Sequence, residues 1–151
     1  MDAPRLELTG LCSNPLALRR EDLARLPADA QVDDVARLVP GRAGRAVRLA
    51  ALRALAGERP GARFLDVASQ DSNFAVSVPI AEVANALVVY ELDGAPLPPA
   101  KGGPFRLLVP GHADECVHVK QVARLALSAA HGRDTRPLDD AEHAKLHAKK
   151  K

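Results

Sequence analysis

The 151-residue chain is poor in aromatic residues, with no tryptophan, one tyrosine and three phenylalanines. It also has little net charge, because 21 basic side chains against 19 acidic ones leave a formal charge of +2. A charge that small does not draw a whole molecule to nucleic acid or to an acidic membrane surface, so we expect neither as a partner. Any anion that binds must be held by a local group of side chains.

Long apolar runs are lacking as well. No run approaches the roughly 20 residues that span a bilayer, and the first residues do not combine a basic segment with an apolar one, so we expect a cytoplasmic protein. The two cysteines, Cys12 and Cys116, lie far apart in sequence and form no C-x-x-C pair, which predicts reduced thiols. Cys12 is expected to be a small buried hydrophobe.

The chain does have a hydrophobic content of 47%, which is enough for one domain with a core. Short strand-like and helix-like segments alternate without a regular βαβ rhythm, which predicts an α+β fold built on a mixed β-sheet. Asp93-Gly94 is the strongest hairpin signal. Strands are expected at residues 6–10, 31–38, 63–68, 74–78, 87–92 and 105–109, and within 117–127, where a slip in the alternation predicts a bulge or a helical turn. Helices are expected at residues 19–26, at 47–55 before Gly57, and at 79–86.

Composition divides the chain into a domain over residues 1–130 and a charged C-terminal tail over residues 131–151. The tail has acids near its start and three lysines at its end, so we expect either a helix that these charges stabilise or a mobile segment. His143 and His147 lie four apart and could share a helical face. Solvated tail histidines are the simpler interpretation, because no third ligand accompanies them.

One stretch, VPGRAGRAVRL at residues 39–49, is rich in glycine and arginine and could hold an anion through backbone N–H groups and guanidinium side chains. Seven arginines and one acid lie from Arg37 to Arg63, so the local charge is positive although the whole chain is nearly neutral. Two interpretations stay open. Either a phosphate or pterin-like anion binds here, or the arginines solvate the outer face of an amphipathic helix.

Four segments follow one another along residues 6–127: LTGLCSNPLALRREDLARLP, GRAVRLAALRALAG, LVVYELDGAPLPPAKGGPFRLLVPG and VHVKQVARLAL. In order and spacing they resemble the molybdopterin-binding domain of the sulfite oxidase family. That family has a G-x-x-x-N-P-x-x-L start, a W-x-G-V-x-L-x-x-L-L segment, a Y-x-L-N-G-x-P-L-P step, a G-x-P-x-R-x-x-V-P-G strand and loop, and a V-K-W turn. The resemblance implies a mixed α+β domain with molybdopterin as its cofactor and, for an active member, a molybdopterin-dependent oxidoreductase.

The resemblance breaks down where the family holds its metal. There the pterin dithiolene and one cysteine thiolate bind molybdenum, and the cysteine opens a C-x-G-N-R segment. The matching position here is Val39, which has no lone pair to give a metal. The family's tryptophan position is Gly44, its Asp-Tyr step near the metal is similar to residues 71–74 (DSNF), and Tyr90 is expected to be structural. Two interpretations stay open. The favoured one is a pseudoenzyme that keeps the fold and lacks the usual redox activity, and the other is an enzyme with altered metal ligation.

The same resemblance, with the arginine-rich stretch, selects candidate residues for holding an anionic cofactor. Two of them match the family's P-x-R strand and V-K turn, and one lies in the loop that approaches the pterin phosphate in the family. The five candidates are Arg42, Arg45, Arg106, His112 and Lys120.

Alternatives remain for the loop GHADECVHVK and for the whole domain. Cys116 lies between His112 and His118, where a thiol could be near a cofactor without replacing the missing ligand. These three residues could instead bind zinc, although they lack the usual paired spacing. The alternative for the domain is a non-enzymatic module that binds another small anion or a protein partner on the same fold.

Overall fold

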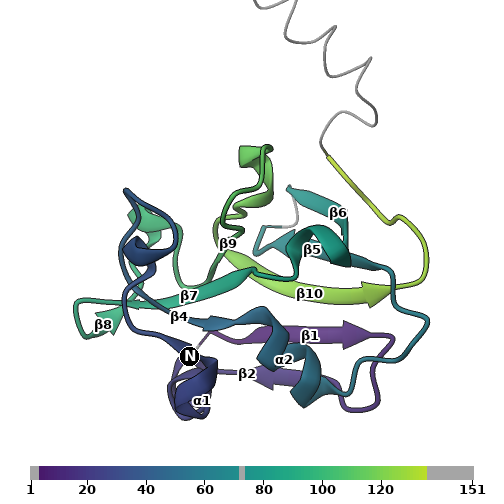
Figure 1. Cartoon of the computed structure of the whole chain (residues 1–151), viewed down its shortest axis with the longest axis horizontal. Helices are drawn as coiled ribbons and strands as arrows, with labels where there is room; N and C mark the ends of the chain where they lie inside the picture. The colour runs from purple at the N-terminus through teal and green to yellow at the C-terminus, as the bar shows by residue number, and fades with distance from the viewer. Residues whose placement is uncertain (1–3, 72–73, 136–151) are drawn as a thin grey trace, which may run out of the picture.

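The computed structural model describes residues 4–71 and 74–135, and within them two β-sheets of five strands each form most of the molecule (Figure 1). The first sheet has the order β2 (Leu16–Leu18), β1 (Leu6–Gly10), β10 (Val122–Ser128), β5 (Phe64–Ser69) and β6 (Ala75–Pro79). The second has β3 (Gln31–Val32), β4 (Arg45–Arg48), β7 (Leu87–Leu92) and β8 (Ala95–Pro96), with β9 (Arg106–Leu108) also paired to β7. β1 and β10 run parallel, and the other pairs of described strands are antiparallel.

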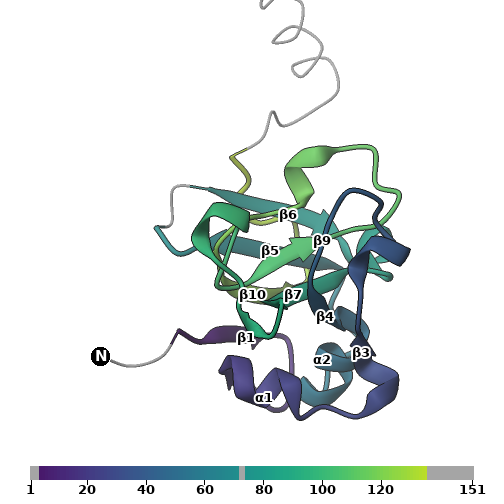
Figure 2. The ribbon, with the colours of Figure 1, turned by 90° about the vertical axis from the view of Figure 1, so that its left-hand side faces the viewer.

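The helices are short, and the two α-helices lie at the same end of the molecule (Figure 2). They are α1 (Arg20–Ala24) and α2 (Leu49–Ala56). Gly57 ends α2 in the left-handed conformation, with a φ of 69°, so the predicted stop is confirmed. The 3₁₀ helices are η1 (Ala28–Ala30), η2 (Val35–Arg37), η3 (Ile80–Val83), η4 (Pro99–Lys101) and η5 (Glu115–Val117).

The hydrophobic core has two parts, with β7 between them. Val88 and Tyr90 belong to the larger cluster, which also receives the buried leucines of β1 and β10. Leu87 and Val89 belong to a smaller cluster with residues of β3, η2 and β9. Because both faces of β7 are buried, its sequence LVVYEL is a nearly continuous apolar run.

The α+β class is confirmed, and so are the predicted hairpins. β5 and β6 pair antiparallel where residues 63–68 and 74–78 were expected to do so. Asp93 and Gly94 have φ angles of 53° and 79°, and these positive values suit the two-residue turn between β7 and β8.

The slip in alternation predicted within residues 117–127 is also confirmed. η5 ends at Val117, and the register of β10 against β5 shifts between Val122 and Arg124. Of the two alternatives, the bulge is therefore the one that occurs within this segment, because η5 lies before it and shares only Val117 with it.

Two predicted elements have other bounds than expected, because other hydrogen bonds replace those of the predicted strand and helix. The strand expected at residues 31–38 is wrong beyond Val32, since Asp34 Oδ1 accepts a hydrogen bond from Ala36 N–H at 3.0 Å and starts η2. The helix expected at residues 47–55 begins at Leu49, because β4 pairs with both β3 and β7 up to that point.

Smaller differences complete the comparison. The helix predicted at residues 79–86 is a single 3₁₀ turn, η3, and the one predicted at residues 19–26 is reduced to α1. The three-residue strand β2 has no alternation long enough to predict it, yet it pairs with β1.

After β10 the chain runs along the outer edge of β6. Thr135 N–H donates to Ala75 O at 2.8 Å, and Ser77 N–H donates to Asp134 Oδ2 at 3.0 Å. Most of the predicted tail, including His143 and His147, lies outside the described residues. Within the described parts of the chain, no helix has the length and apolar character needed to cross a membrane.

Candidate functional site

A cavity of about 470 Å³ opens where the β5–β6 hairpin, β9 and the loop between η5 and β10 meet. Three cationic side chains, Arg42, Arg106 and Lys120, contribute to its wall. They are three of the five predicted site residues. The other lining residues are Ser69, Asp71, Phe74, Cys116, His118, Val119 and Gln121.

Gly102 allows two of these cations to lie close together. Its φ is +94°, and a Cβ added there would lie 2.9 Å from Arg106 Cδ and 3.2 Å from Lys120 Cγ. The stems of both side chains therefore pass close beside the glycine. Arg106 is only 9% exposed, so an anion beside its guanidinium group meets a charge that water screens weakly.

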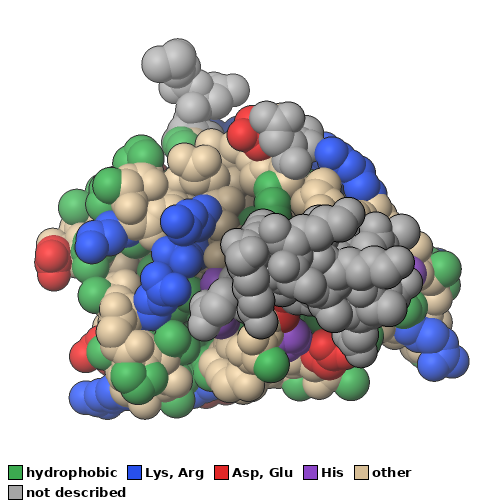
Figure 3. All heavy atoms as spheres, turned by 90° about the horizontal axis from the view of Figure 1, so that it is seen from above, with side chains coloured by type: hydrophobic (Ala, Val, Ile, Leu, Met, Phe, Trp, Pro, Cys, Tyr) green, Lys and Arg blue, Asp and Glu red, His purple; other side chains and the backbone are tan. Residues whose placement is uncertain are grey.

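The positive region extends beyond the main cavity. A neighbouring hollow of about 110 Å³ shares Arg42 and Arg106 and adds Lys101. Seen from above, Lys and Arg side chains gather on one side of the molecule, with histidine next to them (Figure 3). Cations that lie far apart in the sequence thus form a local group. Such a group can hold an anion although the net charge of the chain is only +2.

His118 faces the cavity in a defined tautomer. It is 9% exposed, and its Nδ1 accepts a hydrogen bond from Val109 N–H at 3.0 Å. Since Nδ1 acts as the acceptor, the proton of the neutral ring is on Nε2. His118 was not among the five predicted cofactor residues.

His112 lies outside the cavity lining, although it was predicted as a cofactor residue. Its Nδ1 accepts from Asp114 N–H at 3.0 Å, and its Nε2 lies 3.0 Å from Glu82 Oε1. Asn85 Nδ2 also donates to Pro110 O at 3.0 Å. These contacts anchor the loop to η3 and its C-terminal end.

The cysteines are free, as predicted, and differ in environment. Cys12 is buried, whereas Cys116 is exposed and lines the cavity. The zinc alternative gains no support, because both nitrogens of His112 and one of His118 already have hydrogen-bond partners. In the described ranges, no group of three His, Cys, Asp or Glu residues could hold a metal ion.

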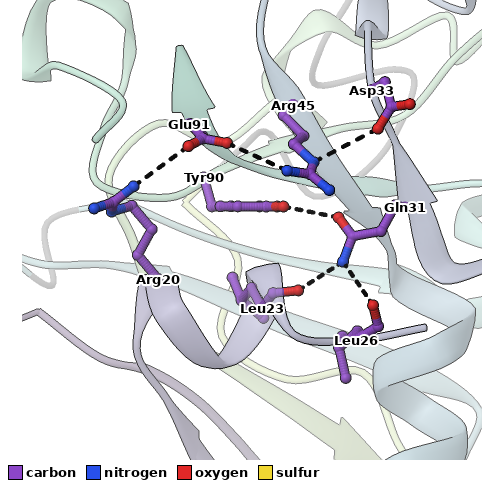
Figure 4. A network of polar contacts seen from close by, with 8 residues as sticks. All are labelled: Arg20, Leu23, Leu26, Gln31, Asp33, Arg45, Tyr90 and Glu91. Carbon is purple, nitrogen blue, oxygen red and sulfur yellow. Dashed lines mark hydrogen bonds and ion pairs between the residues drawn. The ribbon is translucent and has the colours of Figure 1, made fainter. Parts of the chain in front are cut away.

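Arg45 belongs to a different polar network (Figure 4). Its Nε lies 3.6 Å from Asp33 Oδ1, and its Nη1 lies 3.8 Å from Glu91 Oε2. Arg45 lines a separate hollow of about 600 Å³. Four acidic residues line the same hollow: Asp33, Asp34, Glu91 and Asp93. Four carboxylates around one guanidinium make this hollow a poor place for an anion.

Tyr90 has a structural role in the same region, as its hydrogen bonds show. Its hydroxyl donates to Gln31 Oε1 at 2.7 Å, and Gln31 Nε2 donates to the carbonyls of Leu23 and Leu26 at 2.8 and 3.2 Å (Figure 4). These bonds join the end of α1 to β3 and β7. Burial raises the pKa of the Tyr90 hydroxyl above its ordinary value.

Val39 and Gly44, the positions matching the family's cysteine and tryptophan, are built into the scaffold. Val39 is half-buried and packs against the smaller apolar cluster. Gly44 has a φ of +124°, and an added Cβ would lie 2.7 Å from Glu91 O and 2.9 Å from Val89 Cγ1. This backbone has no room for a tryptophan side chain at Gly44.

Sequence reasoning also placed residues 71–74 near the site, and Asp71 and Phe74 do line the cavity. It missed Gln121, which follows directly after Lys120 in the V-K-W-like turn. The sequence did offer a signal for Gln121, because the turn from which Lys120 was selected has Gln121 as its next residue.

The sequence profile of the family described as oxidoreductase molybdopterin binding domain matches residues 45–135, more than half of the chain. The chain belongs to this family. The match covers two of the three cations of the molybdopterin-binding domain's cavity, Arg106 and Lys120, and leaves Arg42 just before it.

Among solved structures, this molybdopterin-binding domain is similar to the crystal structure of the sulfane dehydrogenase SoxCD from Paracoccus pantotrophus. The two share 25% sequence identity with a TM-score of 0.69 over 89% of this chain. The chain spans only 40% of the SoxCD chain that it matches. No curated protein sequence matches it.

Proposed function

We propose that this domain binds molybdopterin, or a closely related pterin that carries a phosphate, in the cavity lined by Arg42, Arg106 and Lys120. The observation that carries the proposal is the meeting of three cations from separate segments in one cavity of a chain whose net charge is only +2. Guanidinium and ammonium groups are the usual protein partners of phosphate oxygens. Phe74 and Val119 add apolar wall suited to a flat ring.

The donor set of this chain suits the organic part of the cofactor better than the metal. Molybdopterin supplies a dithiolene for molybdenum, and members of the family add a protein thiolate. At the matching position Val39 offers no lone pair, and its side chain packs into an apolar cluster. We therefore propose that the domain holds the pterin without the usual molybdenum-dependent redox activity.

A second candidate is a non-enzymatic module that binds another small anion on the same fold. It is favoured by the neighbouring hollow of about 110 Å³, in which Lys101 joins Arg42 and Arg106. This candidate uses the same three cations but places no demand on the apolar wall.

Three probes separate these candidates: neopterin phosphate, neopterin and inorganic phosphate, each titrated by calorimetry. We expect neopterin phosphate to bind most tightly and Lys120→Met to weaken it about tenfold, since a hydrogen bond to a charged group is lost. Arg124→Met is the matched control, because Arg124 of β10 is an exposed cation that pairs with Glu7 of β1. Equal affinity for neopterin phosphate and inorganic phosphate would favour the small-anion module. Unchanged affinity in Lys120→Met would contradict both candidates.

Metal analysis tests the role proposed for Val39. In protein purified from a host that makes the cofactor, we expect pterin without stoichiometric molybdenum. Val39→Cys should increase the molybdenum retained per protein, because it restores a thiolate at the proposed ligand position. Stoichiometric molybdenum in the unmodified protein, or no gain in the variant, would count against the equivalence of Val39 with the family's cysteine.

A further inference from the structure

Gln121 combines a cavity position with an unusual backbone. It lines the cavity of Arg42, Arg106 and Lys120, and its φ is +53°. Residues other than glycine rarely adopt this left-handed backbone conformation, and those that do are mostly Asn, Asp and His. A long side chain held in a costly conformation at a binding site points to a function for that side chain.

Both backbone groups of Gln121 are fixed by its neighbours. Its N–H donates to Gly102 O at 2.7 Å, and its carbonyl accepts from Gln70 N–H at 2.8 Å. Gly102 is the glycine beside the stems of Arg106 and Lys120, whereas Gln70 belongs to the turn after β5. Gln121 therefore joins two walls of the cavity, and its Cα–Cβ direction is set before any ligand enters.

The chemistry of the side chain differs from that of its neighbours. The amide of Gln121 carries no charge, and it both donates and accepts hydrogen bonds. The family pattern that this segment resembles has tryptophan at the position after V-K, so this chain presents an amide where the pattern has an indole. An amide matches a ring edge on which a donor and an acceptor lie side by side, as Asn and Gln match adenine in DNA.

We propose that Gln121 is a specificity-determining residue, whose amide reads the donor and acceptor edge of a heterocyclic ring while the three cations hold the phosphate attached to it. The proposal rests on the function proposed above. It assigns the cavity to phosphate esters of hydrogen-bonding heterocycles such as the 2-amino-4-oxopyrimidine part of a pterin. Phosphate esters of plain aromatic rings would gain nothing from this residue.

The experiment compares two phosphate esters in the full-length protein. Neopterin phosphate has the hydrogen-bonding edge, and phenyl phosphate has a ring without one. Gln121→Met keeps the length of the side chain and the strained backbone but removes the amide. We expect it to weaken neopterin phosphate about fivefold to tenfold and to leave phenyl phosphate unchanged. Gln70→Met is the matched control, because Gln70 is exposed and bonds Gln121 through its backbone alone.

A stability measurement shows whether Gln121 recognises the ligand or only stabilises the fold. Gln121→Gly should unfold at a urea concentration no lower than the unmodified protein, since glycine tolerates the left-handed conformation, yet it should lose the same preference for neopterin phosphate. Unchanged neopterin phosphate binding in Gln121→Met, or equal weakening of both esters, would overturn the proposal for Gln121 and leave the anion cavity standing. If the unmodified protein binds neither ester, the proposed function and this inference fail together.

Discussion

At the scale of single residues, burial is the main cause of the shifted pKa of Tyr90. Its pKa is raised mainly by burial, with Arg45 opposing and Glu91 adding to the rise. The folded state therefore holds the phenolic proton more firmly than the unfolded chain, whose tyrosine titrates near its ordinary value of about 10. The stability from this group is fully present below that pH and is lost as the pH rises through the folded pKa.

Replacing Tyr90 with phenylalanine tests this linkage. Tyr90→Phe should cost about 1 kcal/mol at neutral pH, because the bond to Gln31 Oε1 is lost, and should reduce the loss of stability above about pH 10. Urea unfolding between pH 7 and 11 measures both effects. Since Tyr90 is the only tyrosine in the sequence, tyrosinate absorbance reports its titration directly. An unchanged alkaline slope in the variant would refute the argument.

The site residues show what a linear pattern can predict. Arg106 and Lys120, which line the cavity, could be selected from the sequence because each lies in a short motif with its own local context. Arg45 and His112 were placed elsewhere by carboxylates from distant segments, Glu91 and Glu82, which no spacing rule reveals. Gln121 could have been noticed from the turn that holds Lys120, but its positive φ leaves no sign in the sequence.

At the scale of elements, periodicity predicted the strands that the core buries and failed where short-range hydrogen bonds compete. β5, β6 and β7 alternate or run apolar over five or six residues, so their pattern is clear. Residues 31–38 look extended, but one aspartate turns them into η2. The boundary between β4 and α2 depends on pairing with β7, which lies about 40 residues later and leaves no local trace.

Gly57 carries a prediction at this scale. Gly57→Ala should destabilise the fold by about 1–2 kcal/mol, because alanine at a φ of 69° strains the end of α2 and its Cβ would lie 3.2 Å from Ser13 Cβ. Gly61→Ala is the control, since its Cβ would meet only Leu11 Cδ1 at 4.0 Å. Equal urea midpoints for the two variants would show that the left-handed cap is not what matters.

At the scale of the whole molecule, residues 131–135 complete the edge of the first sheet. The side chain of Asp134 is 4% exposed and accepts from Ser77 N–H, and Thr135 bonds to Ala75. The family match extends to residue 135 as well. A sheet edge with unpaired backbone groups is a site for aggregation, so covering it protects the molecule.

Asp134→Ala should therefore lower stability by about 1–3 kcal/mol, because Ser77 N–H loses its acceptor at a buried position. The Thr135 hydroxyl accepts from Ala75 N–H at 3.2 Å and donates to Ala75 O at 3.0 Å. Thr135→Val removes these two bonds and keeps the one from Thr135 N–H, and it should cost less because the lost acceptor is neutral and not charged. Thermal unfolding measures both. A smaller loss for Asp134→Ala than for Thr135→Val would reverse this assignment.

The parallel pairing of β1 with β10 also governs when the molecule can fold. Glu7 and Arg124, which face each other across this pair, are 117 residues apart, and β10 is the last strand of the described chain. While the chain is being synthesised, the first sheet cannot close until β10, which ends at Ser128, has left the ribosome. Such a high contact order implies slow folding, with the inner edge of β1 uncovered until β10 pairs with it.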